Sequence, residues 1–211
     1  LTYQNAVTGN PNDLAARFAY DTTSVYLQDR WQVTDALLLT YGVRYEQYSS
    51  NDTPRANQAF FNRYGFFNTE TYDGRDLVLP RFGFEWRLTD RTSVSGGVGL
   101  FGGGTPNVWL SNSYSNDGVI QANVTITPTT ATIPQAVRDA ALLNVTGQIP
   151  AAVQAYLATL PGTGTVNAVD PNFEIPSSWR YNLGLEHEAN FGFLGDGWNL
   201  SADLEYTEVK D

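Results

Sequence analysis

Residues 25–48 read VYLQDRWQVTDALLLTYGVRYEQY, which is too rich in aromatic and aliphatic residues for a loop and too charged for a buried strand. Successive side chains of a strand point to opposite faces. Counted in steps of two, residues 37–46 have one largely polar face and one apolar face, made of Leu37, Leu39, Tyr41, Val43 and Tyr45. The stretch therefore predicts a β-hairpin with two different surroundings.

The same alternation recurs in residues 79–88, 177–188 and 198–207. Each segment keeps the pattern for about 10 residues, the length that a tilted strand needs to cross a bilayer, whereas ordinary strands run to about 5–6 residues. Short turns at Thr34-Asp35-Ala36, Thr89-Asp90-Arg91 and residues 189–197 alternate with much longer connections. Short turns on one side and long loops on the other are typical of outer-membrane β-barrels.

A soluble β-sandwich also has two-faced strands. The charges on the polar face favour the membrane barrel, because a dry core would impose a large desolvation cost on them, whereas a hydrated lumen would not. The side chains predicted to face the lumen are Arg44, Glu46, Arg81, Glu85, Arg87, Arg180, Glu186 and Glu188. Aromatic residues near the strand ends suit the lipid interface. They are Trp31, Tyr45, Trp86, Trp179, Trp198 and Tyr206.

One residue conflicts with the lipid-facing prediction. By parity Asp29 shares the apolar face with Val25, Leu27 and Trp31. A bulge, a neighbouring cation or a position near the interface would each make this carboxylate tolerable.

The fold class predicted is all-β: an antiparallel transmembrane β-barrel segment of about six strands with long external loops. Residues 1–211 form part of one barrel, with membrane hairpins at 22–48, 79–102 and 177–208 and a long extracellular loop at 103–176. Two segments of that loop begin with Pro and repeat apolar residues at helical spacing, PQAVRDAALLN and PAAVQAYLATL, so we expect two short helices in an external lid. Six strands are too few to close a barrel, so others must complete it.

Composition narrows the functional classes. The formal net charge of -10 argues against nucleic acid as a partner, because phosphate binding needs clustered Lys and Arg. The chain has no Cys, which excludes a thiolate metal site and a Cys nucleophile. There is no initiating Met and no signal peptide at its start, so we expect a fragment or a processed chain.

The segment VYLQDRWQVTDALLLTYGVRYE resembles a barrel hairpin of TonB-dependent outer-membrane receptors. Its matching features are Gln28-Asp29-Arg30-Trp31, the Thr34-Asp35 turn and Gly42-Val43-Arg44-Tyr45. The segment LPRFGFEWRLTDRTSVSGGVGLF resembles the next hairpin, and VDPNFEIPSSWRYNLGLE is similar to a later strand of the Oar-like subgroup. The resemblance implies a 22-strand barrel with a plug in its lumen, energised by a TonB-type inner-membrane partner. This chain has no recognisable plug or TonB box.

Candidate ligand contacts follow the fourth long strand, where aromatic and amide side chains suit stacking on a sugar or peptide and hydrogen bonding to it. They are Asn107, Trp109, Asn112, Tyr114 and Asn116, and packing of the loop on itself would explain them equally well. Gly102-Gly103-Gly104 is not followed by Gly-Lys-Ser/Thr or by a helix start, so it predicts a flexible exit rather than a phosphate loop. The acids Asp73, Asp76, Asp117 and Asp170 are expected to be solvated. The lone His187 is expected to be an interfacial ring, without catalytic or metal roles.

We therefore expect part of a TonB-dependent receptor that takes up a scarce solute across the bacterial cell outer membrane, without enzymatic activity or a cofactor. Its partners would be outer-membrane lipid, the rest of the barrel and the plug, a TonB-type energising protein, and a small-molecule, peptide or glycan solute. A surface scaffold or protein-interaction barrel without transport is one alternative. A soluble secreted glycan-binding β-domain is another.

Overall fold

The computed structural model describes residues 1–102 and 107–210. These residues form two compact units. The strand unit contains residues 21–49, 74–102 and 174–210, and the loop unit contains residues 1–20, 50–73 and 107–173. The strand unit is thus made of the three hairpins, and the loop unit is made of the N-terminal segment and the long connections.

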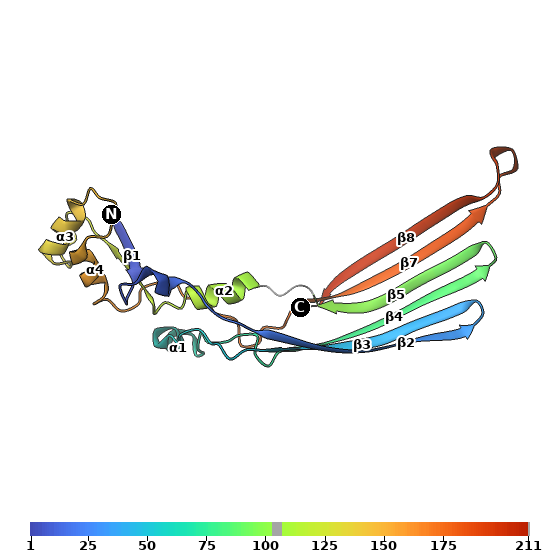
Figure 1. Ribbon diagram of the computed structural model, residues 1–211, viewed down its shortest axis with the longest axis horizontal. Coiled ribbons are helices and arrows are strands. Elements are labelled where there is room, and N and C mark those ends of the chain that lie inside the picture. The colour runs from blue at the N-terminus through green and yellow to red at the C-terminus, as the bar shows by residue number, and fades with distance from the viewer. Residues whose placement is uncertain (103–106, 211) are drawn as a thin grey trace. The chain divides into compact units, whose positions relative to one another are not determined.

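The strand unit is a six-stranded antiparallel sheet in the order β2-β3-β4-β5-β7-β8 (Figure 1). The first hairpin is β2 (Asp21–Thr34) and β3 (Leu37–Ser49), and the second is β4 (Asp76–Thr89) and β5 (Thr92–Gly102). The third is β7 (Ser177–Ala189) and β8 (Trp198–Lys210). With 11 to 14 residues each, these strands are long enough to cross a bilayer, and they confirm the predicted fold class. Asp76 was predicted to precede this strand, but it is the first residue of β4.

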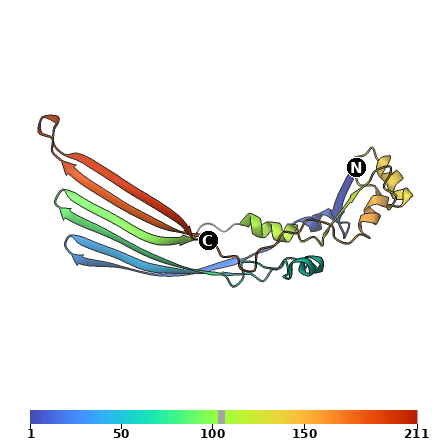
Figure 2. The same cartoon turned by 180° about the vertical axis from the view of Figure 1, so that it is seen from behind.

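The three short turns lie together at one end of the sheet, as the view from behind shows (Figure 2). Two of them share the sequence Thr-Asp, and the threonine hydroxyl fixes each turn locally. Thr34 Oγ1 accepts hydrogen bonds from the backbone N–H of Ala36 and of Leu37, and Thr89 Oγ1 accepts one from Arg91 N–H. Short polar side chains that bond the backbone two residues on favour tight turns. The third turn contains a 3-10 helix, η2 (Gly192–Leu194).

The pairing register places side chains of similar character next to one another across the sheet. Trp31, Leu39, Phe84, Gly96, Leu183 and Leu204 are paired in succession, and so are Asp29, Tyr41, Phe82, Val98, Tyr181 and Tyr206. Directly paired residues of neighbouring strands lie on the same face. The apolar face is therefore continuous over all six strands, and most of its large side chains are exposed.

The loop unit has a small core of its own. Strand β1 (Thr2–Ala6) pairs with β6 (Gln121–Thr125), and helices α3 (Gln135–Leu142) and α4 (Ala151–Leu157) pack against this ribbon (Figure 1). The core side chains are Ala122, Val124, Ile126, Ile133, Val137, Ala141, Val153 and Leu157. Helices α3 and α4 confirm the two predicted helices, and Leu142 at the end of α3 is exposed.

Sequence reasoning missed several elements of the loop unit: the β1–β6 ribbon, η1 (Pro11–Leu14), α1 (Gln58–Tyr64) and α2 (Asn107–Ser115). Helix α1 carries ordinary stop and start signals that could have revealed it. Asn57 caps its N-terminus by accepting from Phe60 N–H, and Gly65 ends it in the left-handed region at φ 83°. No helix in the described part of the chain is long and apolar enough to cross a membrane.

Candidate functional site

Helix α2 carries or adjoins all five residues predicted to contact a ligand, and these residues lie on different sides of the helix. It begins soon after β5, so the expectation that no helix start follows the Gly-rich segment is wrong. Gly103 and Gly104 lie outside the described residues. Leu110, Ser113 and Tyr114 form its buried side. At 100° per residue, Trp109, Asn112 and Asn116 share another side of the helix.

Tyr114 is largely buried and is part of the packing of the loop unit. Only 8% of it is exposed. Its ring stacks on Phe18 with centroids 4.5 Å apart, and its hydroxyl donates to the backbone oxygen of Asp52 at 2.6 Å. Burial is the main cause that raises the pKa of Tyr114. The hydroxyl therefore keeps its proton, and this hydrogen bond, at a pH where a free tyrosine would ionise.

Asn107 and Trp109 remain on the surface. Trp109 is 60% exposed, and its ring meets Phe173 edge-on with centroids 6.2 Å apart. The two rings help to line a cavity of about 120 Å³ together with Tyr72, Ala168, Val169 and Asp170. Asn107 Oδ1 accepts a hydrogen bond from the Tyr20 hydroxyl at 2.7 Å. The cavity is too small for a drug-sized ligand, which needs roughly 300 Å³ or more, but it has room for one side chain or head group.

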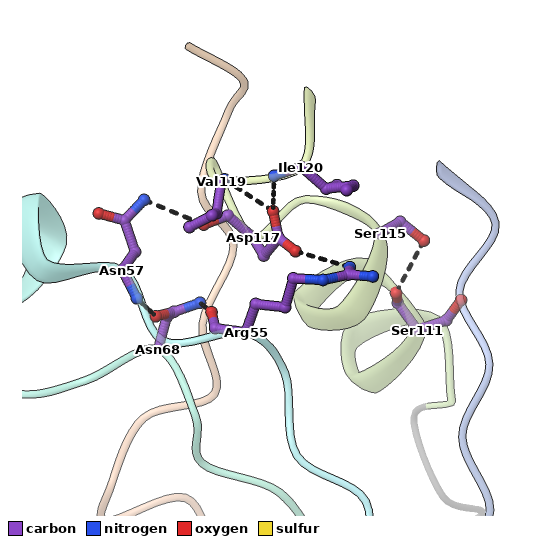
Figure 3. A network of polar contacts seen from close by, with 8 residues as sticks. All are labelled: Arg55, Asn57, Asn68, Ser111, Ser115, Asp117, Val119 and Ile120. Carbon is purple, nitrogen blue, oxygen red and sulfur yellow. Dashed lines mark hydrogen bonds and ion pairs between the residues drawn. The ribbon is translucent and has the colours of Figure 1, made fainter. Parts of the chain in front are cut away.

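Asp117 holds the loop unit together. It has no exposed surface, so the expectation of a solvated acid is wrong here. One carboxylate oxygen accepts from the backbone N–H of Val119 at 2.7 Å and of Ile120 at 2.9 Å, and the other pairs with Arg55 Nη1 at 3.1 Å (Figure 3). A buried charge is tolerated only when it is paired and hydrogen-bonded in this way.

Two amides extend this network and bring segments that are distant in sequence together (Figure 3). Asn57 Nδ2 donates to the backbone oxygen of Asp117 at 3.0 Å. Asn68 Oδ1 accepts from Asn57 N–H at 2.8 Å, and Asn68 Nδ2 donates to the backbone oxygen of Arg55 at 3.0 Å. The network joins the segment before β4 to the segment after α2, and its role is structural.

The polar face of the strand unit brings the charged residues of the predicted lumen together on one side of the sheet. Register places Gln28, Gly42, Arg81, Gly99, Arg180 and Thr207 in one row across it. The next row holds Arg30, Thr40, Gly83, Gly97, Asn182 and Glu205. Except for Arg30, these residues line a hollow of about 610 Å³ on the polar face. Arg44 and Glu46, further along β3, form an ion pair at 2.7 Å.

The opposite face carries the predicted interface aromatics, and Trp31, Trp86, Trp198 and Tyr206 are about half exposed. Asp29 lies on this face beside them, and its partner is one that the sequence analysis did not consider. The hydroxyl of Tyr41, directly opposite on β3, donates to Asp29 Oδ2 at 2.9 Å, and the backbone N–H of Arg30 donates to Oδ1 at 2.8 Å. A carboxylate on an apolar face is thereby hydrogen-bonded on both oxygens.

His187 lies near the turn end of β7, opposite Thr92, and its Nδ1 is 2.9 Å from Thr92 Oγ1. Within residues 1–102 and 107–210, no group of three His, Asp or Glu side chains is placed to hold a metal ion.

A protein-family profile described as an outer membrane beta barrel domain matches residues 1–197. No curated protein and no solved structure matches the chain significantly.

Proposed function

The chain belongs to the outer membrane beta barrel domain family, and from this premise we propose that it is part of a TonB-dependent receptor that takes up a scarce solute. Membership gives the chain its location, the bacterial outer membrane. In our proposal the exposed apolar face contacts lipid. Transport and TonB dependence go further than membership and rest on the arguments that follow.

The polar face of the sheet is the observation that most supports a transport role. If the apolar face meets lipid, the face with Arg81, Glu85 and Arg180 must point to the inside of a closed barrel. That face has a hollow of about 610 Å³ with charged walls. Such a hollow suits the passage of a hydrated solute, whereas the interior of a small barrel is filled by side chains.

The open sheet edges support a larger barrel than six strands can make. Strands β2 and β8 each pair on one side only within the described residues. In hydrocarbon, every unpaired backbone group costs several kcal/mol, so these edges need partner strands. In our proposal these strands, and a plug in the lumen, belong to the rest of the receptor.

Capture of the solute is assigned to the loop unit. Its long connections are folded rather than extended, because Asp117 and the core under α3 and α4 hold them together. A long loop with its own structure is usually functional. Trp109 and its neighbours Asn112 and Asn116 would contact the solute first, and plug rearrangement driven through TonB would then admit it, as the family resemblance implies.

The test is a gene deletion in the native host. We expect the wild-type strain to deplete one solute from its growth medium, and the deletion strain to leave that solute in the medium. Mass spectrometry of the two spent media measures the difference. A proton uncoupler should abolish the difference, because TonB-driven import depends on the proton gradient. Equal depletion by both strains would disprove transport. The intact mass of the polypeptide from native membranes, compared with 23.2 kDa, will reveal whether the remaining strands and plug lie on the same chain.

A scaffold without transport is the second candidate, and one feature of the loop unit favours it. Leu143 and Val145 follow α3 and are 78% and 94% exposed, although both are apolar. Exposed apolar side chains that lie close together are common at protein contact sites. A partner protein that co-purifies with the wild type but not with a Leu143→Ser, Val145→Ser double variant, in a host without solute uptake, would establish the scaffold instead.

A further inference from the structure

The hollow on the polar face of β3, β4, β5 and β7 has a floor of glycines. Gly42, Gly83, Gly97 and Gly99 lie there in two adjacent rows of the sheet. Glycine in a strand weakens it, and often marks a place where a ligand or another backbone approaches closely. The missing side chains leave room over the sheet for the side chains of Arg81, Phe101 and Asn182.

Phe101 occupies part of the space that Gly99 leaves. A Cβ built on Gly99 would lie 3.0 Å from Cε2 of Phe101 and 3.2 Å from Cγ of Arg81. The ring of Phe101 is therefore folded back over Gly99 and lies beside the stem of Arg81. Any larger residue at position 99 would push the ring away from its place.

The same ring holds two arginines. The guanidinium carbons of Arg81 and Arg180 lie 4.6 Å and 5.3 Å from the centroid of Phe101. Contact with an aromatic face engages the flat side of a guanidinium and leaves its in-plane N–H donors available. Neither guanidinium makes an ion pair or a side-chain hydrogen bond with any residue that the structure describes.

We propose that Arg81 and Arg180, positioned by Phe101, bind the carboxylate of a small anionic solute in this hollow. The proposal rests on the transport function, since it names the chemical class of the solute. Guanidinium forks match carboxylates with two parallel hydrogen bonds, which gives both affinity and orientation. Arginines on a pore wall also attract anions electrostatically. They create a local positive site although the net charge of the protein is -10.

The hollow also contains Glu85 and Glu205, which narrow the choice of anion. Their negative charges oppose the two charges concentrated on one phosphate group more than those of a dicarboxylate, which its carbon chain keeps apart. A small carboxylate is therefore the ligand that the electrostatics of the whole hollow favour.

The experiment measures equilibrium dialysis of radiolabelled glutarate against the full-length protein in detergent micelles, with glutaramide and inorganic phosphate as competitors. We expect Arg81→Gln and Arg180→Gln each to weaken glutarate binding roughly 10-fold, the usual effect of losing a charge-assisted hydrogen bond. Glutaramide, which is neutral, should not compete. Phe101→Leu keeps both charges and should weaken binding by a smaller factor because it removes the positioning ring.

Arg30→Gln is the matched control, because Arg30 lies on the same face of the sheet but does not line the hollow. It removes one positive charge and should leave glutarate binding unchanged. Equal losses in Arg30→Gln and Arg81→Gln, or phosphate binding tighter than glutarate binding, would overturn the proposal. Circular dichroism confirms that each variant keeps its strands.

Uptake assays separate this proposal from the function on which it rests. If the wild-type strain imports a solute and the two arginine variants import it equally well, the carboxylate site is refuted and the transport function stands. If glutarate binding depends on both arginines but no solute is imported, the transport function is refuted and the anion site stands.

Discussion

Apolar side chains are buried in the loop unit but exposed in the strand unit. Leu157 in α4 is completely buried, whereas Leu204 in β8 is 66% exposed. The loop unit thus has an apolar core, as expected for a structure surrounded by water. The strand unit has its apolar side chains exposed, which suits lipid better than water.

The two units also differ in how they accommodate charged groups. In the loop unit, Asp117 is buried and depends on a fixed set of partners. On the polar face of the strand unit, Arg81 and Arg180 are exposed, and their guanidinium groups lie over an aromatic ring. The solvent next to each surface, more than the residue type, therefore decides which substitution is damaging.

The largest effect is expected in the loop unit, from Asp117→Ala. The substitution leaves the N–H groups of Val119 and Ile120 without their acceptor and Arg55 without its partner. Each N–H group left without an acceptor costs about 1–3 kcal/mol, so the two together cost about 2–6 kcal/mol, whereas the half-exposed Arg55 can be solvated. We expect the free energy of unfolding of the loop unit to fall by about this amount, measured by pulse proteolysis in urea on the full-length protein in micelles.

Asp139→Ala is the control for Asp117→Ala. Asp139 is an exposed acid in α3 of the same unit, so its loss should change the free energy of unfolding by less than about 0.5 kcal/mol. Similar unfolding of both variants would show that net charge, and not the Asp117 network, stabilises the unit.

The next largest effect is expected on the lipid face, from Leu204→Arg. Leu204 is close to the middle of β8. A charged side chain at the bilayer midplane destabilises a membrane barrel by about 2–4 kcal/mol. Urea titration of the protein in lipid vesicles should detect this loss. Ser201→Arg, on the polar face of the same strand, should be nearly neutral, and an equal loss there would reverse the assignment of the two faces.

A smaller effect is expected from Tyr41→Phe, which removes one hydrogen bond from Asp29 on the lipid face. Asp29 keeps the N–H of Arg30, so the change should be less damaging than Leu204→Arg. Tyr41→Phe should lower stability in vesicles, and Asp29→Leu combined with it should restore the loss. A double variant that is less stable than Tyr41→Phe alone would show that Asp29 itself stabilises the barrel.

The sequence predicted the strand unit well because alternation is a direct consequence of strand geometry. Leu37, Tyr41 and Arg44 each lie on the face that counting in steps of two assigned to them. Asp29 was the exception, and its partner could not be inferred, because the hydroxyl of Tyr41 reaches it only through the pairing register of two strands.

The loop unit was less predictable because its elements are short and its contacts are distant in the chain. Asp117 looked like a solvated loop acid, and its partner Arg55 lies 62 residues away. Strand β1 pairs with β6 more than 100 residues later. Only local signals were readable, such as Pro before α3 and α4, and the Asn57 and Gly65 caps of α1, which were overlooked.

The smallest effect on stability is expected from Trp109→Ala, although its effect on function should be large. Trp109 is 60% exposed and touches Phe173 only at a ring edge, so the free energy of unfolding should change by less than about 0.5 kcal/mol. Solute depletion by the host should nevertheless slow markedly, because exposed aromatic side chains of this kind carry much of the binding energy at contact sites. The matched control is Tyr114→Ala, which removes a buried ring and should destabilise the loop unit directly. If Trp109→Ala leaves uptake unchanged, the solute is captured elsewhere, and the hollow on the polar face becomes the first place to search.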